Sequence, residues 1–599
     1  MCKDEGRAHG PSLFIFCAGL SLLAASLFTD RWYQWIGIAL LALACAPWRS
    51  LPANLLGLLT VSYCAWLFVN AVFVSPVHAA EGIYQPLMLL GGFVAFATLG
   101  RDRAVELFGA SVALVSGLVL FGLLQHFLGI WQFDLAVWRL PDNPLRAAAT
   151  FVTPNSFATA INMFLVPLAG LYIVRGSGRS LAILLWLFAG LVATHSRGGM
   201  LAFLAGLAFV AVCLGLPALR EGKIRIRNLL LGWIAVWIAV VLAGSLAVPA
   251  SPGDAARVPA TAPWLERGTA ERPELYAATL DLIREHPLAG AGANMFFPLF
   301  EAVKSESLRD SEYYYAHNDY LQVWLEFGAP GIALLLLLAA ASLVIALRAQ
   351  RRSPGDAMPL VCGAALATCF AHAVVDFPFY IPFVLMLAGA CLGALAAHSG
   401  GQLPAPAARI AGRALELVSP PIRWALAFAA LAWLAQPMLA EMAVLRSIVL
   451  LARGEAREAI YWQSVARRLE PRHPAHYWAE ATIWREQALL TRNPQLAAQA
   501  DALFAEGTRV NRYDVANLLG RINLHRRLPE LLKDAASPAE VLSWAERAAR
   551  LRPQHLTVQA ELARTLAYAG KREQARALAR SLAEKHPRSD FAQRMAKEL

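Results

Sequence analysis

The sequence predicts an all-α protein: a polytopic bundle of about 12–13 transmembrane helices, a large extracytoplasmic loop and a C-terminal α-solenoid. Three observations support this fold class. Of the 599 residues, 58% are hydrophobic and only 16% are charged, and the mean hydropathy is +0.48. The apolar residues form runs of roughly 18–25 residues, long enough to cross the hydrocarbon core of a bilayer. After about residue 442, the composition changes to Ala, Leu, Arg and Glu at helical spacing.

The apolar runs are interpreted as thirteen candidate spans, which the basic residues orient. Lys and Arg fall in every second connection, including Arg175 with Arg179 and the cluster at 220–227. These connections are predicted to be cytoplasmic, because membrane proteins carry an excess of basic residues on that side. The first run lacks a convincing cleavage site and is interpreted as a retained span. The spans lie at about 11–29, 33–48, 52–75, 84–100, 105–129, 155–174, 180–195, 199–217, 229–248, 329–348, 357–375, 378–397 and 422–441.

This topology divides the chain into four segments. Residues 1–248 form the N-terminal transmembrane helices, and residues 329–441 form the C-terminal ones. Between them, 249–328 is predicted to be a large extracytoplasmic loop. The tail, 442–599, is placed on the same side as the loop. That placement depends on the last span, which contains Pro437; if this segment only lies on the membrane, the tail is cytoplasmic.

The tail repeats a short pattern at an offset of 34 residues. Ala-Ala-Arg-Leu-Arg-Pro, ending at Pro553, corresponds to Leu-Ala-Glu-Lys-His-Pro, ending at Pro587, and a weaker copy lies around 455–474. This period is that of tetratricopeptide repeats, in which each helix hairpin buries its apolar face on its neighbour. The alternative is a plain helical solenoid without a concave groove. The tail is a predicted contact surface for a protein partner.

Composition excludes several other classes. The net charge of +11 lies largely in clusters beside apolar runs, so membrane lipids are predicted as partners and nucleic acid is not. The eight cysteines lie in predicted spans or in the short N-terminus, which implies no disulfide framework. The chain contains no Asp-x-Asp, no His-Glu-x-x-His and no Gly-rich phosphate loop. Neither a metal nor a cofactor is therefore predicted.

Local signals predict the structure of the large loop. Arg272-Pro273-Glu274 opens a helix, because proline at the first turn lacks only an N–H that would be unpaired there. This helix is expected to end at His286-Pro287, with Gly290 and Gly292 forming a turn and Asn294 capping a further short helix.

His317 is the candidate catalytic residue. It lies among aromatic and polar residues at the end of the loop, just before the chain enters the bilayer, where ionisable residues are uncommon unless they serve a function. Asn318 and Asp319 follow it, and either could cap the next helix. A free helix start and nearby positive charge suit a phosphate-bearing ligand and keep an imidazole neutral as a base. The alternative is a histidine that only caps or hydrogen-bonds the loop.

Other charged residues are its candidate partners. Arg197 lies in a turn between two spans, on the side where arginine is not favoured, although it could snorkel to lipid phosphates. Arg272 opens the loop helix, or is a solvated surface charge. Arg146 precedes the sixth span and could add positive potential. His372 and Asp376 lie one turn apart near the outer end of the eleventh span, where they either act on a substrate or hydrogen-bond each other.

Taken in order, these residues resemble the O-antigen ligase/polymerase superfamily of bacterial envelope glycosyltransferases, over roughly residues 140–400. The loop signature carries most of the resemblance, and three shorter matches support it. The signature comprises Arg272, His286 to Gly290, Asn294, Phe296, Ala316 to Asp319 and Glu326 to Gly328; the supporting matches are Ser196-Arg197-Gly198, Phe151 with Pro154-Asn155, and His372 with Asp376-Phe377.

The resemblance implies a multi-pass enzyme of the bacterial inner membrane, with its loop in the periplasm. It would move a glycan en bloc from undecaprenyl diphosphate to an acceptor hydroxyl with inversion, without a metal. His317 would be the general base, and Arg197 and Arg272 would hold the diphosphate. Arg146, Asn318, Asp319, His372 and Asp376 would contact substrate. Arginine suits phosphate oxygens because its planar fork binds two of them at once.

The acceptor remains open. Lipid A-core (a ligase), a growing glycan (a polymerase) and a protein serine (an O-oligosaccharyltransferase) are all compatible with the shared loop. Two alternatives are not enzymes. A lipid or polysaccharide transporter is expected to show internal repeats or interrupted helices among its spans, and neither is clear here. A membrane-anchored repeat scaffold would need far fewer spans.

Overall fold

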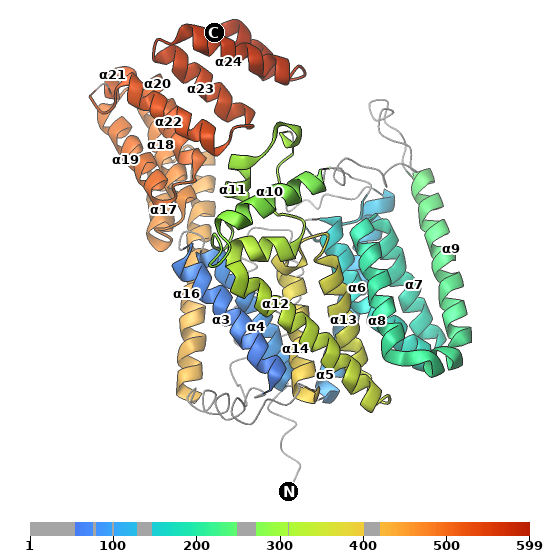
Figure 1. The fold of residues 1–599 in the computed structure, drawn as a ribbon. Coiled ribbons are helices and arrows are strands. Elements are labelled where there is room, and N and C mark those ends of the chain that lie inside the picture. The colour runs from blue at the N-terminus through green and yellow to red at the C-terminus, as the bar shows by residue number, and fades with distance from the viewer. Residues whose placement is uncertain are drawn as a thin grey trace.

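The computed structural model of the protein describes residues 54–75, 79–98, 101–128, 146–151, 153–247, 271–309, 311–399, 420–532 and 534–599. Every regular element within these residues is a helix, so the predicted all-α class is confirmed. The helices form an elongated bundle, and the loop helices and the tail lie at one end of it (Figure 1). The predicted spans 11–29 and 33–48 lie outside the described residues.

Each predicted span from 52–75 onward corresponds to a helix. Seven helices among the described residues are long and apolar enough to cross a membrane, and four shorter apolar helices lie beside them. The protein is therefore a multi-pass membrane protein. The bundle helices are α3 (Leu55–Phe73), α4 (Ala79–Thr98), α5 (Arg101–Leu128), α6 (Pro154–Arg175), α7 (Gly178–Ala193), α8 (Arg197–Glu221), α9 (Lys223–Ala247), α12 (Asp319–Arg352), α13 (Met358–His372), α14 (Pro382–Ser399) and α16 (Pro420–Ala452).

Polar side chains fix where several of these helices begin. The Thr153 hydroxyl accepts a hydrogen bond from the Ser156 backbone N–H at 3.1 Å, and Pro154 takes the first helical position of α6. In the same way, Ser196 caps α8 through the Gly199 N–H at 3.0 Å. Both caps lie at the end of the bundle that carries the loop (Figure 1), so polar groups concentrate there.

The basic turns lie at the opposite end of the bundle. The Arg175 guanidinium donates to the carbonyl of Gly355 at 2.8 Å, and Arg225 Nε donates to the carbonyl of Ile173 at 2.6 Å. These bonds join the α6–α7, α12–α13 and α8–α9 turns at the end farthest from the loop (Figure 1). Loop and basic turns are thus separated, as the alternation of charge along the sequence predicts.

Small residues allow helices α4 and α14 to approach each other closely. A Cβ at Gly389 of α14 would overlap the carbonyl of Leu89 in α4, and a Cβ at Gly92 of α4 would overlap the carbonyl of Met386. Membrane helices gain little from the hydrophobic effect when they associate, so close backbone approach and van der Waals packing hold them together.

The large loop folds around its own small core. It contains α10 (Arg272–Glu285), α11 (Phe296–Val303) and a short 3-10 helix (Glu306–Leu308). Helix α10 begins and ends where the sequence predicted. Asn294 does not cap α11 as expected: it adopts a left-handed φ of 57°, and Met295 precedes the helix without a side-chain bond. Buried apolar residues of both helices meet the first turns of α12; they are Leu275, Leu282, Ile283, Phe296, Phe300 and Leu325.

A kink in α12 fastens the loop to the bundle. Gly328 has a φ of 68°, which interrupts the helix and releases backbone carbonyls. The loop fills this gap: Ala291 N–H donates to the Leu325 carbonyl at 2.7 Å, and Gly292 N–H donates to the Glu326 carbonyl at 2.9 Å. The loop residues and α12 approach so closely that a Cβ at Gly328 would overlap the Leu288 carbonyl.

The bundle also supplies donors to this junction. Trp66 Nε1 donates to the Phe327 carbonyl at 2.8 Å, and Asn70 Nδ2 donates to the Ala289 carbonyl at 2.7 Å, both from α3. The fully buried Glu326 carboxylate accepts from Tyr380 Oη at 2.7 Å and from the Phe296 N–H at 3.3 Å. Asn70 and Glu326 are buried, and these hydrogen bonds favour one arrangement of loop and membrane helices.

The tail is a stack of helix hairpins. Helix α16 continues to Ala452, past the predicted boundary, and Pro437 does not end it. The tail helices are α17 (Ala456–Leu469), α18 (Pro474–Thr491), α19 (Pro494–Val510), α20 (Val515–Arg527), α21 (Pro529–Leu532), α22 (Pro538–Leu551), α23 (Leu556–Tyr568), α24 (Arg572–Lys585) and α25 (Asp590–Glu598). Helices α22 and α24 start 34 residues apart, as do α23 and α25, which matches the repeat found in the sequence.

We predict that Gly328→Ala lowers the melting temperature of the protein and loosens the loop. Alanine at a left-handed φ costs about 1–2 kcal/mol, and its Cβ would also meet the Leu288 carbonyl. Thermal unfolding of the purified protein in detergent measures the effect. Gly109→Ala in α5 is the control, because a Cβ there would meet nothing within 4 Å. Equal melting temperatures for the two variants would show that the kink does not hold the loop.

Candidate active site

The candidate site lies where the loop meets the ends of four bundle helices. It is formed by the starts of α6, α8 and α12 and the segment that follows α13 (Figure 1). The Asp319 N–H donates to the carbonyl of Ala373 at 2.8 Å, which joins the start of α12 to the end of α13. Thr159 of α6 hydrogen-bonds His372 of α13 at 2.6 Å. The site is therefore built from residues that are distant in sequence.

His317 is held in a defined and strained position. Its φ is 50°, in the left-handed region, and its carbonyl accepts a hydrogen bond from Tyr276 Oη at 2.8 Å. The rings of Tyr313 and Phe377 approach the imidazole edge-to-face, with centroids 5.9 and 5.1 Å away. The side chain is still 25% exposed. The imidazole is thus fixed in orientation but remains within reach of a substrate.

Asp376 is the partner of His317. The distance from its Oδ1 to His317 Nδ1 is 3.0 Å, and the carboxyl group is buried. Burial alone would raise the pKa of Asp376. The hydrogen bond and charge of His317, together with the charges of His372 and Arg272, outweigh burial and bring this pKa below its ordinary value. An ionised Asp376 favours a proton on Nδ1 and leaves a lone pair on Nε2.

His372 does not bond Asp376, which corrects the mutual hydrogen bond considered from the sequence. Helix α13 ends at His372, and the turn after it carries Asp376 toward His317. His372 Nδ1 instead lies 2.6 Å from the Thr159 hydroxyl. Within the described part of the chain, its Nε2 has no hydrogen-bond partner, and a Cβ added to Gly198 would lie 2.9 Å from it. Gly198 therefore lets the start of α8 rest against His372.

Two of the predicted arginines begin helices beside this pair. Arg197 is the first residue of α8, next to Gly198 and hence to His372. Arg272 is the first residue of α10, and its charge is one of those that lower the pKa of Asp376. Both side chains are partly exposed. The starts of α8 and α10 therefore bring positive charge to the neighbourhood of His317 and Asp376.

Arg146, the third predicted arginine, lies beside the start of α6. Its Nε donates to the Thr194 carbonyl at 2.9 Å, and its Nη2 donates to Asn155 Oδ1 at 3.1 Å. These bonds tie it to the α7–α8 turn and to the start of α6. His195 of that turn is a neighbour: burial first, then the charges of His126 and Arg146, lower the pKa of His195 to about 4. At neutral pH this histidine is uncharged and adds no positive charge beside Arg146.

Asn318 and Asp319 have structural roles in this arrangement. Asn318 is the N-cap of α12, and its Oδ1 accepts from the N–H groups of Tyr320 and Leu321, each at 3.1 Å. Asp319 is fully buried and accepts from the Phe379 N–H at 2.7 Å. His372 is likewise fully buried. In this structure protein groups cover both the Asp319 and the His372 side chains.

Several residues of the site were not predicted from the sequence. Tyr276, Thr159 and Tyr313 orient His317 or His372, and Glu271 accepts hydrogen bonds from Tyr313 and Ser311. Helical spacing could have suggested Tyr276, which lies one turn after Arg272. Thr159 had no such signal, because a hydroxyl in a membrane span usually bonds its own helix. Among the described residues, no group of three or more His, Cys, Asp or Glu side chains could hold a metal ion.

Comparison with known proteins agrees with the resemblance noted from the sequence. Residues 182–336, from α7 to the middle of α12, match the model of a family described as O-antigen ligase. The matched region contains Arg197, Arg272 and His317. The expected resemblance to the O-antigen ligase/polymerase superfamily is confirmed over this region, and the match supports a role in membrane glycan transfer. No curated protein matches the chain.

One solved structure similar to this chain is the crystal structure of yeast Tom70. It is 13% identical, and the alignment covers 74% of this chain and 92% of that one. The TM-score is 0.19, so the likeness supports no inference about this protein. The hairpin repeat of the tail is established by its own helix spacing instead.

We predict that Asp376→Asn lowers the rate of glycan transfer by about 10²–10⁴-fold, because an amide no longer favours the Nδ1–H form of His317. Transfer by purified protein from a lipid-linked donor measures the effect. Asp281→Asn is the control, since Asp281 is exposed on α10 and pairs with Arg284. A variant at position 376 as active as this control would show that Asp376 does not orient the base.

Proposed function

We propose that the protein is a membrane glycosyltransferase of the O-antigen ligase type. It transfers a glycan en bloc from undecaprenyl diphosphate to an acceptor hydroxyl at the periplasmic face of the bacterial inner membrane. The observation that carries this proposal is the His317–Asp376 pair at 3.0 Å, with a partly exposed imidazole, at the junction of loop and bundle. The family match over residues 182–336 supports the same class of reaction.

In the proposed reaction His317 is the general base. With the Nδ1 proton held toward Asp376, Nε2 accepts the proton of the acceptor hydroxyl as its oxygen attacks the anomeric carbon. The bond between that carbon and the diphosphate oxygen breaks, and the diphosphate leaves with the electron pair. Attack from the face opposite the leaving group inverts the anomeric centre. His317 then returns its proton to water or to the departing lipid diphosphate.

The arginines stabilise the leaving group in this proposal. Negative charge grows on the bridging oxygen as the glycosidic bond breaks, and fixed guanidinium groups stabilise it without reorganisation. Arg197 and Arg272 begin α8 and α10, so the positive ends of these helix dipoles lie beside both arginines. Arg146 adds charge from the α6 side. The protein supplies positive charge through these side chains, and the proposed mechanism needs no metal.

The lipid portion of the donor would lie along the bundle. Helices α8 and α9 expose apolar side chains on their outer surfaces, including Leu204 at 55%, Ile234 at 56% and Trp237 at 43%. In a bilayer these side chains contact lipid tails. A polyprenyl chain can therefore reach the start of α8 from the membrane while its diphosphate stays at the interface. We expect the acceptor to approach from the loop side.

Surface polysaccharide in cells with and without the protein tests the function. A ligase predicts that lipid-linked glycan persists while polymer on lipid A-core is lost. Single repeat units on lipid A-core would indicate a polymerase instead. Unchanged polysaccharide with under-glycosylated proteins would indicate a protein O-oligosaccharyltransferase. No change in any glycan would contradict the proposal and favour a transporter or scaffold.

We predict that His317→Ala reduces transfer by about 10²–10⁴-fold, because the imidazole supplies the base. Membrane levels of the protein should be unchanged, because the hydrogen bond from Tyr276 goes to the backbone carbonyl of residue 317, which alanine keeps. A transfer assay with purified protein, together with immunoblotting of membranes, measures both quantities. His586→Ala in the tail is the control. Full activity of the His317 variant would exclude it as the base.

We predict that Arg197→Lys weakens transfer by about tenfold or more, because lysine keeps the charge but loses the two-pronged guanidinium contact with phosphate oxygens. The apparent KM for the lipid-linked donor should rise. Arg220→Lys, at the other end of the same helix, is the matched control. If both lysine variants are as active as the wild-type protein, Arg197 contributes no more than its positive charge to transfer.

A further inference from the structure

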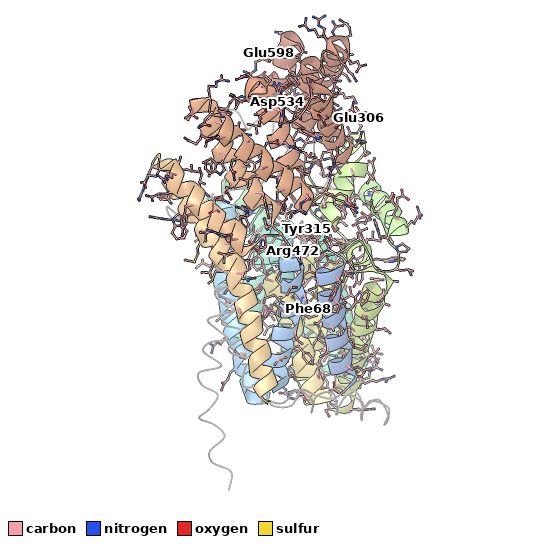
Figure 2. The ribbon with its side chains drawn as sticks, turned by 90° about the vertical axis from the view of Figure 1, so that its left-hand side faces the viewer. Phe68, Glu306, Tyr315, Arg472, Asp534 and Glu598 are labelled. Carbon is pink, nitrogen blue, oxygen red and sulfur yellow. The ribbon has the colours of Figure 1, made fainter. Side chains whose placement is uncertain are left out.

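The repeat tail rests on the loop that carries His317. The guanidinium of Arg552, at the end of α22, lies 5.0 Å from the ring centre of Phe297 in α11. Lys585 Nζ lies 3.1 Å from a Glu306 carboxylate oxygen, and His555 Nε2 lies 4.0 Å from Glu312. Figure 2 shows Glu306 beside the tail helices. Tail hairpins and loop are therefore in contact through charged and aromatic groups.

Two sets of ring contacts, linked through the backbone of Tyr313 and Tyr314, lie between this interface and His317. The Phe297 ring that carries Arg552 also stacks on Tyr314, with centroids 4.5 Å apart. Tyr313, the residue before Tyr314, packs edge-to-face on Phe300 and on His317, with centroids 6.0 and 5.9 Å away. The Tyr313 hydroxyl also bonds Glu271, the residue before Arg272. Movement of the α11–Tyr314 contact would thus reach both His317 and Arg272.

The segment that carries His317 depends on such contacts for its position. Residues 311–318 form no helix, so no ladder of backbone hydrogen bonds holds them. Tyr314 is 56% exposed even with the tail in place. The left-handed φ of His317 must be maintained by surrounding packing, because such a backbone is unfavourable by itself for a residue with a side chain.

We propose that the tail hairpin α22–α23 positions the His317 segment, and that Arg552 is the positioning residue that makes this contact. The inference rests on the proposed function only in assigning the base to His317. Ion pairs between exposed side chains are individually weak, so the contact can open and close. A glycan or protein acceptor bound by the tail hairpins would therefore act on the base through this interface. The tail becomes part of the catalytic assembly.

Steady-state transfer by the full-length protein tests the positioning role. Arg552→Ala should lower kcat by about fivefold or more while the KM for the lipid-linked donor stays unchanged. Arg552→Lys should recover most of the rate, because an ammonium group also interacts with the face of Phe297. Arg550→Ala is the matched control: Arg550 is exposed on the same helix, two residues away. Equal kcat values for the two alanine variants would overturn the inference.

Amide hydrogen exchange separates this inference from the proposed function. Exchange in residues 311–317 should be several-fold faster in Arg552→Ala than in Arg550→Ala, whether or not His317 is the base. Unchanged exchange would overturn the positioning role by itself. Full transfer activity of His317→Ala would overturn the catalytic assignment instead.

Discussion

The backbone bonds between the loop and the kinked helix α12 organise everything that surrounds the candidate site. A helix in a membrane normally pairs all of its own peptide groups, and the break at Gly328 leaves some of them without intrahelical partners. The loop amides of Ala291 and Gly292 and the Trp66 indole satisfy these carbonyls. Because unpaired peptide groups are costly to bury, the kink can exist only with the loop in place. Soluble loop and membrane bundle are in this sense one folded unit.

The loop signature found in the sequence contains residues that hold the loop on the bundle and residues that carry the proposed chemistry. The stretch from His286 to Gly290 and the stretch from Glu326 to Gly328 face each other and hold the loop, whereas Ala316 to Asp319 carries the proposed chemistry. His317 is exposed enough to meet a hydroxyl group, while Asp376 beside it is buried and ionised. Rigid buried groups therefore position a reactive group that remains partly open to solvent. Arg197 and Arg272 lie at the starts of α8 and α10, at the loop end of the bundle.

The tail also contacts the loop that carries His317. Its first helix, α16, runs along the bundle, and its later hairpins return to the loop through Arg552 and Lys585. Figure 2 shows Glu306 beside the tail helices and Tyr315 lower down, near the ends of the bundle helices. An enzyme that joins a membrane-bound donor to a large acceptor needs surfaces for both. In the proposed arrangement, the bundle binds the donor, the tail binds the acceptor, and the loop with His317 lies between bundle and tail.

The sequence alone predicted what depends on local composition: the apolar spans, the alternation of basic turns, the bounds of α10 and the 34-residue spacing of the tail. It also singled out His317, Arg197 and Arg272 through their pattern. It could not decide which carboxylate partners His317, because Asp376 is 59 residues away and closer in sequence to His372. It also assigned Asp319 to substrate, although that side chain is buried. These roles depend on how helix ends meet in space, and long-range packing, not local preference, determines that.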